Sequence, residues 1–315
     1  MSERWSSKGG RSYPVRHGEP PGAEYFARPR DPAGAGRVVL ALDRLAIVLT
    51  GLDVILTDAL RTRYGAYLDD VRADGAADLV VEVARESIEY FIEPPQAPEF
   101  NPVWIACDGT RLRYCGYALA GWLDTEARRG AIVLGTGRAE PEMHAVENFI
   151  RCAVAWCAAE RGGALVHGAS AVRNGKGYLF FGESGAGKST LSEVNTRGSV
   201  VSDDLSLLLP RPDGGLDLVG SPFRGTYEGG PPVLGRYPLA AGFRIVKSER
   251  AAVRAVPRPI AFGQLVGNLT FVAEAFSKRP DLFARVERAF AQVPLHHLEF
   301  RKDDSYWDAI GAAGL

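Results

Sequence analysis

One nine-residue stretch near the middle of the chain combines the residue types that bind phosphate groups. It reads Gly182-Glu183-Ser184-Gly185-Ala186-Gly187-Lys188-Ser189-Thr190. Glycines let a backbone curl so that successive N–H groups point at one anion, and the lysine reaches the terminal phosphates. The spacing is that of a P-loop, Gly-x-x-x-x-Gly-Lys-Ser. We therefore predict a site that binds ATP with Mg²⁺, in which the Ser189 hydroxyl is a metal ligand.

The segments on either side of this motif are those that a P-loop requires. Residues 177–181 are apolar and predict a strand leading in, and residues 190–197 predict a short helix leading out. A further apolar run at 199–202 is followed by Asp203 and Asp204. Adjacent aspartates usually form a solvated turn, but after a buried strand beside a P-loop they can hold a metal or accept a substrate proton. We favour a functional role.

A histidine completes the set of candidate residues. His167 ends the apolar run 164–166 and is followed by Gly168. A single histidine at the end of a strand is more often structural than catalytic, because its ring is readily satisfied by neighbouring polar groups. The residues by themselves leave both roles open.

Together these motifs resemble the catalytic domain of the HPr kinase/phosphorylase family, which are bacterial P-loop serine kinases. That family carries a strand ending in His-Gly, an apolar strand, the sequence Gly-x-Ser-Gly-x-Gly-Lys-Ser, a helix, and a strand ending in Asp-Asp. This chain has His167-Gly168, the P-loop at 182–189 and Asp203-Asp204 in the same order. The resemblance covers about residues 165–225. The preceding part is similar to divergent members found beside peptide-modification genes, some similar to kinases of lasso-peptide precursors.

The resemblance implies an ATP-dependent kinase that phosphorylates a serine or threonine hydroxyl on a protein or peptide. Lys188 would hold the β- and γ-phosphates, Asp204 would accept the hydroxyl proton and Asp203 would belong to the metal site. His167 would orient Asp204 or contact the transferred phosphoryl group. Where the family has a metal-binding carboxylate before an Arg-Gly pair, this chain has Phe223. The phosphorylase signature is not recognisable in residues 256–278, so we expect kinase activity alone.

Three other functions compete with this interpretation. One is an ATPase or GTPase switch, although the chain has no Asn-Lys-x-Asp motif for guanine. Another is phosphoenolpyruvate carboxykinase, which has a similar nucleotide domain but a much longer chain. The last is a non-catalytic ATP-binding module of a peptide-modification system.

The pattern along the chain predicts a mixed α/β protein in three parts. Residues 1–36 are rich in Gly, Pro, Ser and Arg and predict a disordered tail. Residues 37–162 predict an α+β region for substrate recognition, with helices at 58–68 and 141–161 and a hairpin at 103–117. A free strand edge there could add an extended peptide to its sheet. Residues 163–315 predict the P-loop catalytic domain, of the type shared by HPr kinases and phosphoenolpyruvate carboxykinase.

Composition and charge limit the classes of binding partner and the location that we expect for this protein. The formal net charge is −1, with 37 Lys and Arg against 38 Asp and Glu, so no global field attracts nucleic acid or anionic lipid. No apolar run reaches the roughly 20 residues of a membrane helix, and no secretory signal is evident, so we expect a cytoplasmic protein. The four cysteines match no metal-binding spacing and predict buried thiols. Homo-oligomerisation stays open.

Overall fold

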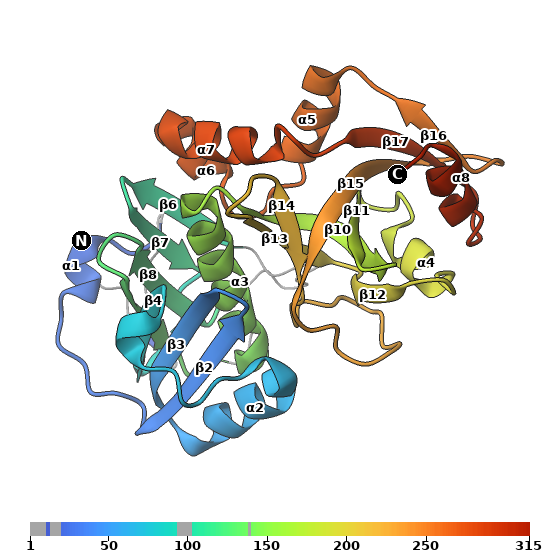
Figure 1. Ribbon diagram of the computed structural model, residues 1–315. Helices are drawn as coiled ribbons and strands as arrows, with labels where there is room; N and C mark the ends of the chain where they lie inside the picture. Colours follow the sequence, from blue (N-terminus) through green and yellow to red (C-terminus); the bar gives the residue numbers. More distant parts are fainter. Residues whose placement is uncertain (1–10, 13–19, 93–102, 138–139) are drawn as a thin grey trace. The chain divides into compact units, whose positions relative to one another are not determined.

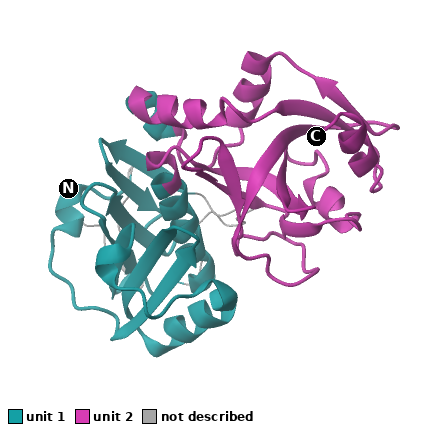
Figure 2. Ribbon diagram, in the orientation of Figure 1, with its two compact units in different colours: residues 1–157, 274–279 teal, residues 158–273, 280–315 magenta. Residues whose placement is uncertain are grey.

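A computed structural model describes residues 11–12, 20–92, 103–137 and 140–315 of this protein. The described chain is mixed α/β, as expected, with two large mixed sheets (Figure 1). It forms two compact units, which are residues 1–157 with 274–279 and residues 158–273 with 280–315 (Figure 2). The first division falls within helix α3 (Glu142–Glu160), slightly before the boundary at residue 162 that the pattern along the chain predicts.

Unit 1 contains a seven-stranded sheet with the order β2-β3-β4-β9-β8-β7-β6. Strand β4 runs parallel to β3 and β9, and the other pairs are antiparallel. The strands are β2 (Gly36–Leu42), β3 (Leu45–Leu52), β4 (Leu79–Arg85), β6 (Trp104–Asp108), β7 (Arg111–Cys115), β8 (Leu119–Asp124) and β9 (Arg129–Leu134). The remaining elements are α1 (Ala23–Phe26), α2 (Val54–Tyr64), most of α3, α6 (Ala273–Lys278), 3-10 turns at Gly65–Tyr67 and Asp74–Ala76, and the paired short strands β1 (Arg11–Ser12) and β5 (Ile88–Tyr90).

The segment before β2 differs from the expectation of a disordered tail over residues 1–36, because residues 20–36 are ordered against the sheet. Tyr25 in α1 is 2% exposed and packs edge-on against Phe91, with ring centroids 6.0 Å apart. The Gly34 N–H donates to the Gly51 carbonyl at 2.8 Å. One buried aromatic ring and a few main-chain bonds attach this segment to the sheet, which a count of aliphatic residues does not detect. Residues 1–10 and 13–19 lie outside the described residues.

Most of the expected elements are present with shifted ends. The helix expected at 58–68 is α2, and the helix expected at 141–161 is α3. The helix after the P-loop, α4 (Lys188–Glu193), starts and stops earlier than the expected 190–197. The expected hairpin joins β6 and β7, but its two-residue turn begins at Gly109, because Asp108 still pairs with Arg111. All four cysteines are buried free thiols, as predicted.

Unit 2 contains an eight-stranded sheet that closes on itself. The path β11-β10-β13-β14-β15 returns to β11 through a parallel β11–β15 pair, and β17 continues parallel to β15 with β16 at its edge. The strands are β10 (Ala164–Arg173), β11 (Lys176–Phe181), β12 (Ser199–Ser202), β13 (Leu205–Pro210), β14 (Leu216–Val219), β15 (Arg236–Lys247), β16 (Ala252–Ala255) and β17 (Leu295–Phe300). The helices besides α4 are α5 (Arg258–Val266), α7 (Pro280–Phe290) and α8 (Tyr306–Ala312).

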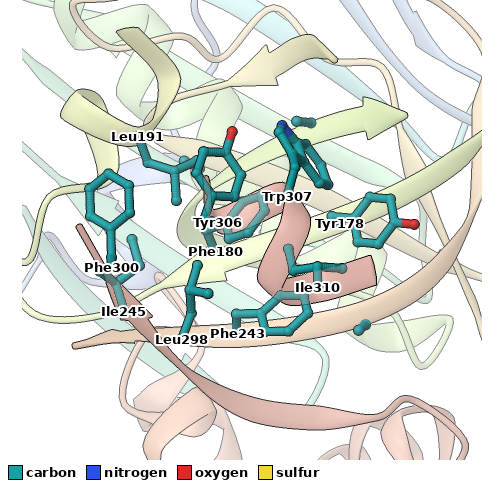
Figure 3. Packing of buried hydrophobic residues seen from close by; sticks show 13 residues of the cluster. Tyr178, Phe180, Leu191, Phe243, Ile245, Leu298, Phe300, Tyr306, Trp307 and Ile310 are labelled. Carbon is teal, nitrogen blue, oxygen red and sulfur yellow. The ribbon is translucent and has the colours of Figure 1, made fainter. Parts of the chain in front are cut away.

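A buried aromatic cluster fixes the strand that carries the P-loop. Phe180 of β11 stacks on Phe243 of β15 with ring centroids 5.6 Å apart, and it meets Trp307 of α8 edge-on at 6.0 Å. Leu191 of α4 belongs to the same cluster (Figure 3). Because both the strand before the loop and the helix after it are anchored in one core, the position of the loop between them is set by packing.

Candidate functional site

The predicted P-loop is a tight turn between β11 and α4. Gly182, Gly185 and Gly187 have φ values of 154°, 75° and 112°, a region that residues with a side chain rarely adopt. A β-carbon on Gly185 would meet nothing within 4 Å, so at that position the backbone conformation alone requires glycine. The glycine spacing seen in the sequence therefore has a conformational cause in the structure.

Lys188 is folded back over this loop. Its side chain is 8% exposed, and its ammonium group donates to the carbonyl oxygens of Gly182 at 2.8 Å and Glu183 at 3.1 Å. Burial lowers the pKa of Lys188, and the negative charge of Asp204 opposes that shift. A partly desolvated cation held by carbonyl groups inside a glycine loop is well suited to meet the oxygens of a polyphosphate.

Main-chain hydrogen bonds place His167 beside Asp204. Strand β10 pairs with β13 up to His167 and with β11 from Gly168 onward, so the histidine lies where β10 changes partner. The Gly168 N–H donates to the Asp204 carbonyl at 2.8 Å, and the His167 N–H donates to the Asn268 carbonyl at 2.8 Å. A β-carbon at Gly168 would come within 2.9 Å of the Phe180 carbonyl oxygen, which explains the glycine after the histidine.

The two side chains face one another as a result. His167 Nε2 lies 3.6 Å from Asp204 Oδ1, which is longer than a hydrogen bond and is an ion pair only when the ring is protonated. Burial lowers the pKa of His167, the neighbouring Lys188 lowers it further, and Asp204 raises it. The ring is consequently neutral at pH 7, because its ordinary pKa is about 6.5.

Asp203 has a different environment from its neighbour. It is 3% exposed, and its Oδ1 accepts the Gly225 N–H at 2.7 Å, whereas Oδ2 accepts the N–H groups of Thr226 at 3.0 Å and Tyr227 at 3.1 Å. Ser202 sets the turn that carries both aspartates, since its hydroxyl donates to the Phe223 carbonyl at 2.7 Å and accepts the Asp204 N–H at 3.0 Å. Asp203 therefore holds the segment 225–227 against the site.

Arg224 fixes the same segment from its other side. Its guanidinium donates to the carbonyl oxygens of Val200 and Val201 in β12, at 3.2 and 3.3 Å. It also donates to three carbonyls of the following loop, those of Gly229, Gly230 and Pro231, at 3.0 to 3.2 Å. One side chain thus ties the loop after residue 224 to the strand that leads into the aspartate pair.

These elements enclose a pocket of about 340 Å³ within unit 2. Its lining comes from β10, the P-loop and α4, the aspartate turn and the segment after Arg224. The lining residues are His167, Ser184, Gly185, Gly187, Lys188, Ser189, Thr190, Asp203, Asp204, Gly225 and Thr226. The structure therefore brings His167, Lys188, Ser189, Asp203 and Asp204 to one pocket.

The residues present can accommodate Mg²⁺ if phosphate oxygens and water supply most of its ligands. Among the described residues, no three His, Cys, Asp or Glu side chains cluster closely enough to form a metal cage. Mg²⁺ in nucleotide sites usually takes only one or two protein ligands. Ser189 and one carboxylate suffice, and Asp203 Oδ1, which accepts a single hydrogen bond, keeps one acceptor position. Phe223, which stands where the family has a metal-binding carboxylate, is fully buried and does not line the pocket.

Three further residues contribute to this pocket and its support without having been predicted from the sequence, namely Ser202, Gly225 and Thr226. Ser202 directly precedes the aspartate pair. Serine favours turns because its hydroxyl can hydrogen-bond the backbone N–H two residues later. Gly225 carried a signal only as the second residue of the Arg-Gly pair and Thr226 carried none, because both join the site through long-range bonds to Asp203.

The sheet edges of unit 1 are partly occupied, which bears on the idea that a peptide adds a strand there. Next to β2, the Asp69 N–H donates to the Val39 carbonyl at 3.0 Å. Next to β6, Lys278 of α6 donates to the Cys107 carbonyl at 3.0 Å. A peptide strand added at either position would have to displace these contacts.

Two comparisons with known proteins found no match: one was a scan of protein-family models and the other a search of curated proteins. The resemblance described above therefore rests on the motifs and their order. Among the described residues, no helix is both long and apolar enough to cross a membrane.

Proposed function

We propose that this protein is an ATP-dependent kinase that phosphorylates a serine or threonine hydroxyl on a protein or peptide. The observation that carries the proposal is the pocket in which Lys188, Ser189 and the glycine loop meet Asp204 and His167. Lys188, Ser189 and the glycine loop suit a triphosphate. Asp204 and His167 suit an acceptor hydroxyl. Phosphoryl transfer depends mainly on positioning and on neutralising charge, and this pocket offers residues for both.

The proposed roles follow from the contacts of each side chain. When the nucleotide binds, the Lys188 ammonium gives up its hydrogen bonds to the loop carbonyl oxygens and donates to β- and γ-phosphate oxygens instead. The acceptor oxygen attacks the γ-phosphorus, its proton passes to the Asp204 carboxylate, and the bond from the γ-phosphorus to the bridging oxygen breaks to release ADP. His167, neutral and 3.6 Å from Asp204 Oδ1, orients that carboxylate.

Mg²⁺, when bound, neutralises charge on the β- and γ-phosphates. Ser189 and Asp203 Oδ1 are the groups that would hold it. The second oxygen of Asp203 is saturated by two N–H donors, so the same carboxylate also keeps segment 225–227 in place.

The test is transfer of labelled γ-phosphate from ATP·Mg²⁺ into the proteins and peptides of a lysate from the source organism. Wild type is compared with Lys188→Ala and Asp204→Asn, and labelled products are identified by mass spectrometry. We expect a phosphoserine or phosphothreonine product with wild type alone. Label found only as free phosphate, at equal rates with and without lysate, would support the ATPase alternative. ATP binding without any turnover would support a non-catalytic binding module.

A further inference from the structure

A second pocket lies in unit 1, on one face of its seven-stranded sheet. It has a volume of about 570 Å³ and is lined by residues of that unit. Strands β3, β4 and β9 form its floor, and the segment 26–34, which precedes β2, forms its wall. Its size is in the range of ligand pockets. The phosphate pocket belongs to unit 2, so this pocket is a separate site.

The strand register explains the floor of this pocket. Thr50, Glu82 and Ala131 are partners across the parallel strands β3, β4 and β9, so their side chains form one row on the same face. Ala84 and Val133 are partners two residues further along and form the next row on that face. Alanine at positions 84 and 131 leaves space that larger side chains would fill. The hollow therefore results from small residues in the middle of the sheet.

The wall of the pocket is poor in hydrogen-bond donors. Pro29 and Pro32 have no main-chain N–H, and Pro32 is bridged to β4. The Ala33 and Gly34 N–H groups already donate to main-chain carbonyls of β4 and β3, at 3.1 and 2.8 Å. These four positions therefore have no N–H left for a ligand, which favours a ligand that donates hydrogen bonds over one that accepts them.

The charges of the lining favour a cation on the floor. The acidic side chain of the lining is Glu82, which is exposed and has no ion-pair partner among the described residues. Arg30 is already ion-paired with Glu86, and its side chain is 11% exposed. Arg28 is exposed. Phe26 adds an aromatic ring to the wall, and such rings attract cations.

We infer that this pocket holds a lysine or arginine side chain of the peptide or protein substrate; the identity of the bound chain rests on the proposed function, whereas the binding itself does not. Such a side chain has an apolar stem, which lies against Ala84, Ala131 and Val133, and a cationic head, which meets Glu82. Lysine and arginine side chains only donate hydrogen bonds, so they suit a wall without free N–H groups. The pocket thus selects substrates by a basic residue away from the acceptor hydroxyl.

The test measures binding of short peptides to the full chain without nucleotide, by NMR titration. Each probe is a five-residue alanine peptide with blocked ends and a central lysine, arginine, norleucine or glutamate. Norleucine keeps the apolar stem of lysine without its charge. Putrescine serves as a free amine that is not part of a peptide.

Three variants and two matched controls accompany the wild type. Glu82→Gln removes the floor charge, and its control is Glu126→Gln, at an exposed position in the turn between β8 and β9. Ala131→Leu fills the hollow, and its control is Ala127→Leu in the same exposed turn. Arg28→Ala removes the exposed cation of the lining. Thermal unfolding checks that each variant is folded, and Glu82→Gln keeps the test valid if Ala131→Leu is unstable.

We expect wild type to bind the lysine and arginine peptides roughly two- to fivefold more tightly than the norleucine peptide, which is what an accessible ion pair supplies. Glu82→Gln should abolish this difference, and Ala131→Leu should weaken lysine-peptide binding at least about tenfold, because the stem no longer fits. Arg28→Ala should strengthen lysine-peptide binding, since it removes a like charge. Both controls should match wild type.

Several results would overturn the inference. Unchanged binding in Glu82→Gln and Ala131→Leu would show that the peptides do not use this pocket. Weaker lysine-peptide binding in Arg28→Ala, or a preference for the glutamate peptide, would show that the pocket selects a carboxylate. Tighter binding of putrescine than of the lysine peptide would overturn the peptide part. Because the probes contain no hydroxyl and no ATP is present, a failed transfer assay would reject the proposed function without changing this result.

Discussion

The Gly225 N–H donates to Asp203 Oδ1 at 2.7 Å, and a β-carbon on Gly225 would lie only 3.0 Å from Asp203 Oδ2. The same β-carbon would be 3.1 Å from that of Asp204. The φ of Gly225 is not in the left-handed region, so the close approach, and not the backbone conformation, is what requires glycine here. The backbone at residue 225 thus forms one side of the aspartate pair.

Gly225→Ala is therefore expected to disturb the site more than the fold. The added methyl must push either the 225–227 segment or the aspartate turn by a few tenths of an ångström. We expect a loss of stability of about 1 kcal/mol and at least a tenfold loss in phosphoryl transfer, because catalysis is sensitive to sub-ångström misplacement. Chemical denaturation and single-turnover transfer measure the two effects.

Gly263→Ala is the matched control for this substitution. Gly263 lies within α5, and a β-carbon there would meet nothing within 4 Å. This change should stabilise the protein by about 0.5–1 kcal/mol and leave transfer unchanged, since alanine favours a helix interior. If Gly225→Ala behaved like Gly263→Ala, the close approach at Asp203 would have no mechanistic importance.

Arg224→Lys tests how the loop after residue 224 is held. The guanidinium donates to five carbonyl oxygens in two segments, and a single ammonium group cannot reach all of them. We expect a stability loss of about 1–3 kcal/mol and faster proteolytic cleavage within residues 225–235. Arg250→Lys, at an exposed position, is the control and should change neither. Equal cleavage rates in the two variants would exclude this role for Arg224.

How far the sequence predicts this site depends on the range of the interactions. The conformation of the loop was predictable because Gly182 to Lys188 are contiguous and the positive φ values are encoded by the glycine spacing. His167 and Asp204 were predictable only as candidates. Their proximity depends on the β10–β13 pairing and on the change of pairing partner along β10 at Gly168, and neither leaves a local signal.

The elements that the sequence does not predict are those that form through long-range strand pairing or packing. Strands β14, β15 and β16 alternate poorly or carry Gly and Pro, so their pattern does not distinguish them from loops. The ordered segment at Tyr25 depends on the ring of Phe91, which is 66 positions later in the chain. Tertiary contacts, rather than propensity, determine these elements.

The titration of His167 gives a test that does not depend on any substrate. Burial and the cation of Lys188 lower its pKa, so we expect an imidazole that is neutral at pH 7 and protonates below the ordinary pKa of about 6.5. Lys188→Met should raise the pKa and Asp204→Asn should lower it further, since each removes one charge beside the ring. NMR titration of the histidine resonances, with His167→Gln for assignment, measures these shifts.

The lowered pKa of His167 also makes the stability of the protein depend on pH. Because the folded state disfavours the charged ring, the unfolded chain takes up the proton first as the pH falls below about 6.5. His167 thus makes the protein less stable as the pH falls from there through the folded pKa. His167→Gln should flatten the dependence of unfolding free energy on pH in that window. An unchanged dependence, or shifts of the wrong sign in the Lys188 and Asp204 variants, would contradict the environment described here.

Asp204→Asn and His167→Ala separate the proton acceptor from the group that orients it. Loss of the carboxylate should lower kcat about 10²- to 10⁴-fold with little change in KM for ATP, because general-base catalysis acts in the transition state. His167→Ala should lower kcat less, by roughly tenfold, because the carboxylate stays but is no longer held. Ser277→Ala is the control, since its hydroxyl donates to the Glu274 carbonyl in α6, outside the pocket. Equal kcat for Asp204→Asn and wild type would show that Asp204 is not the base. A His167→Ala loss as large as that of Asp204→Asn would instead assign the histidine a direct part in the transfer.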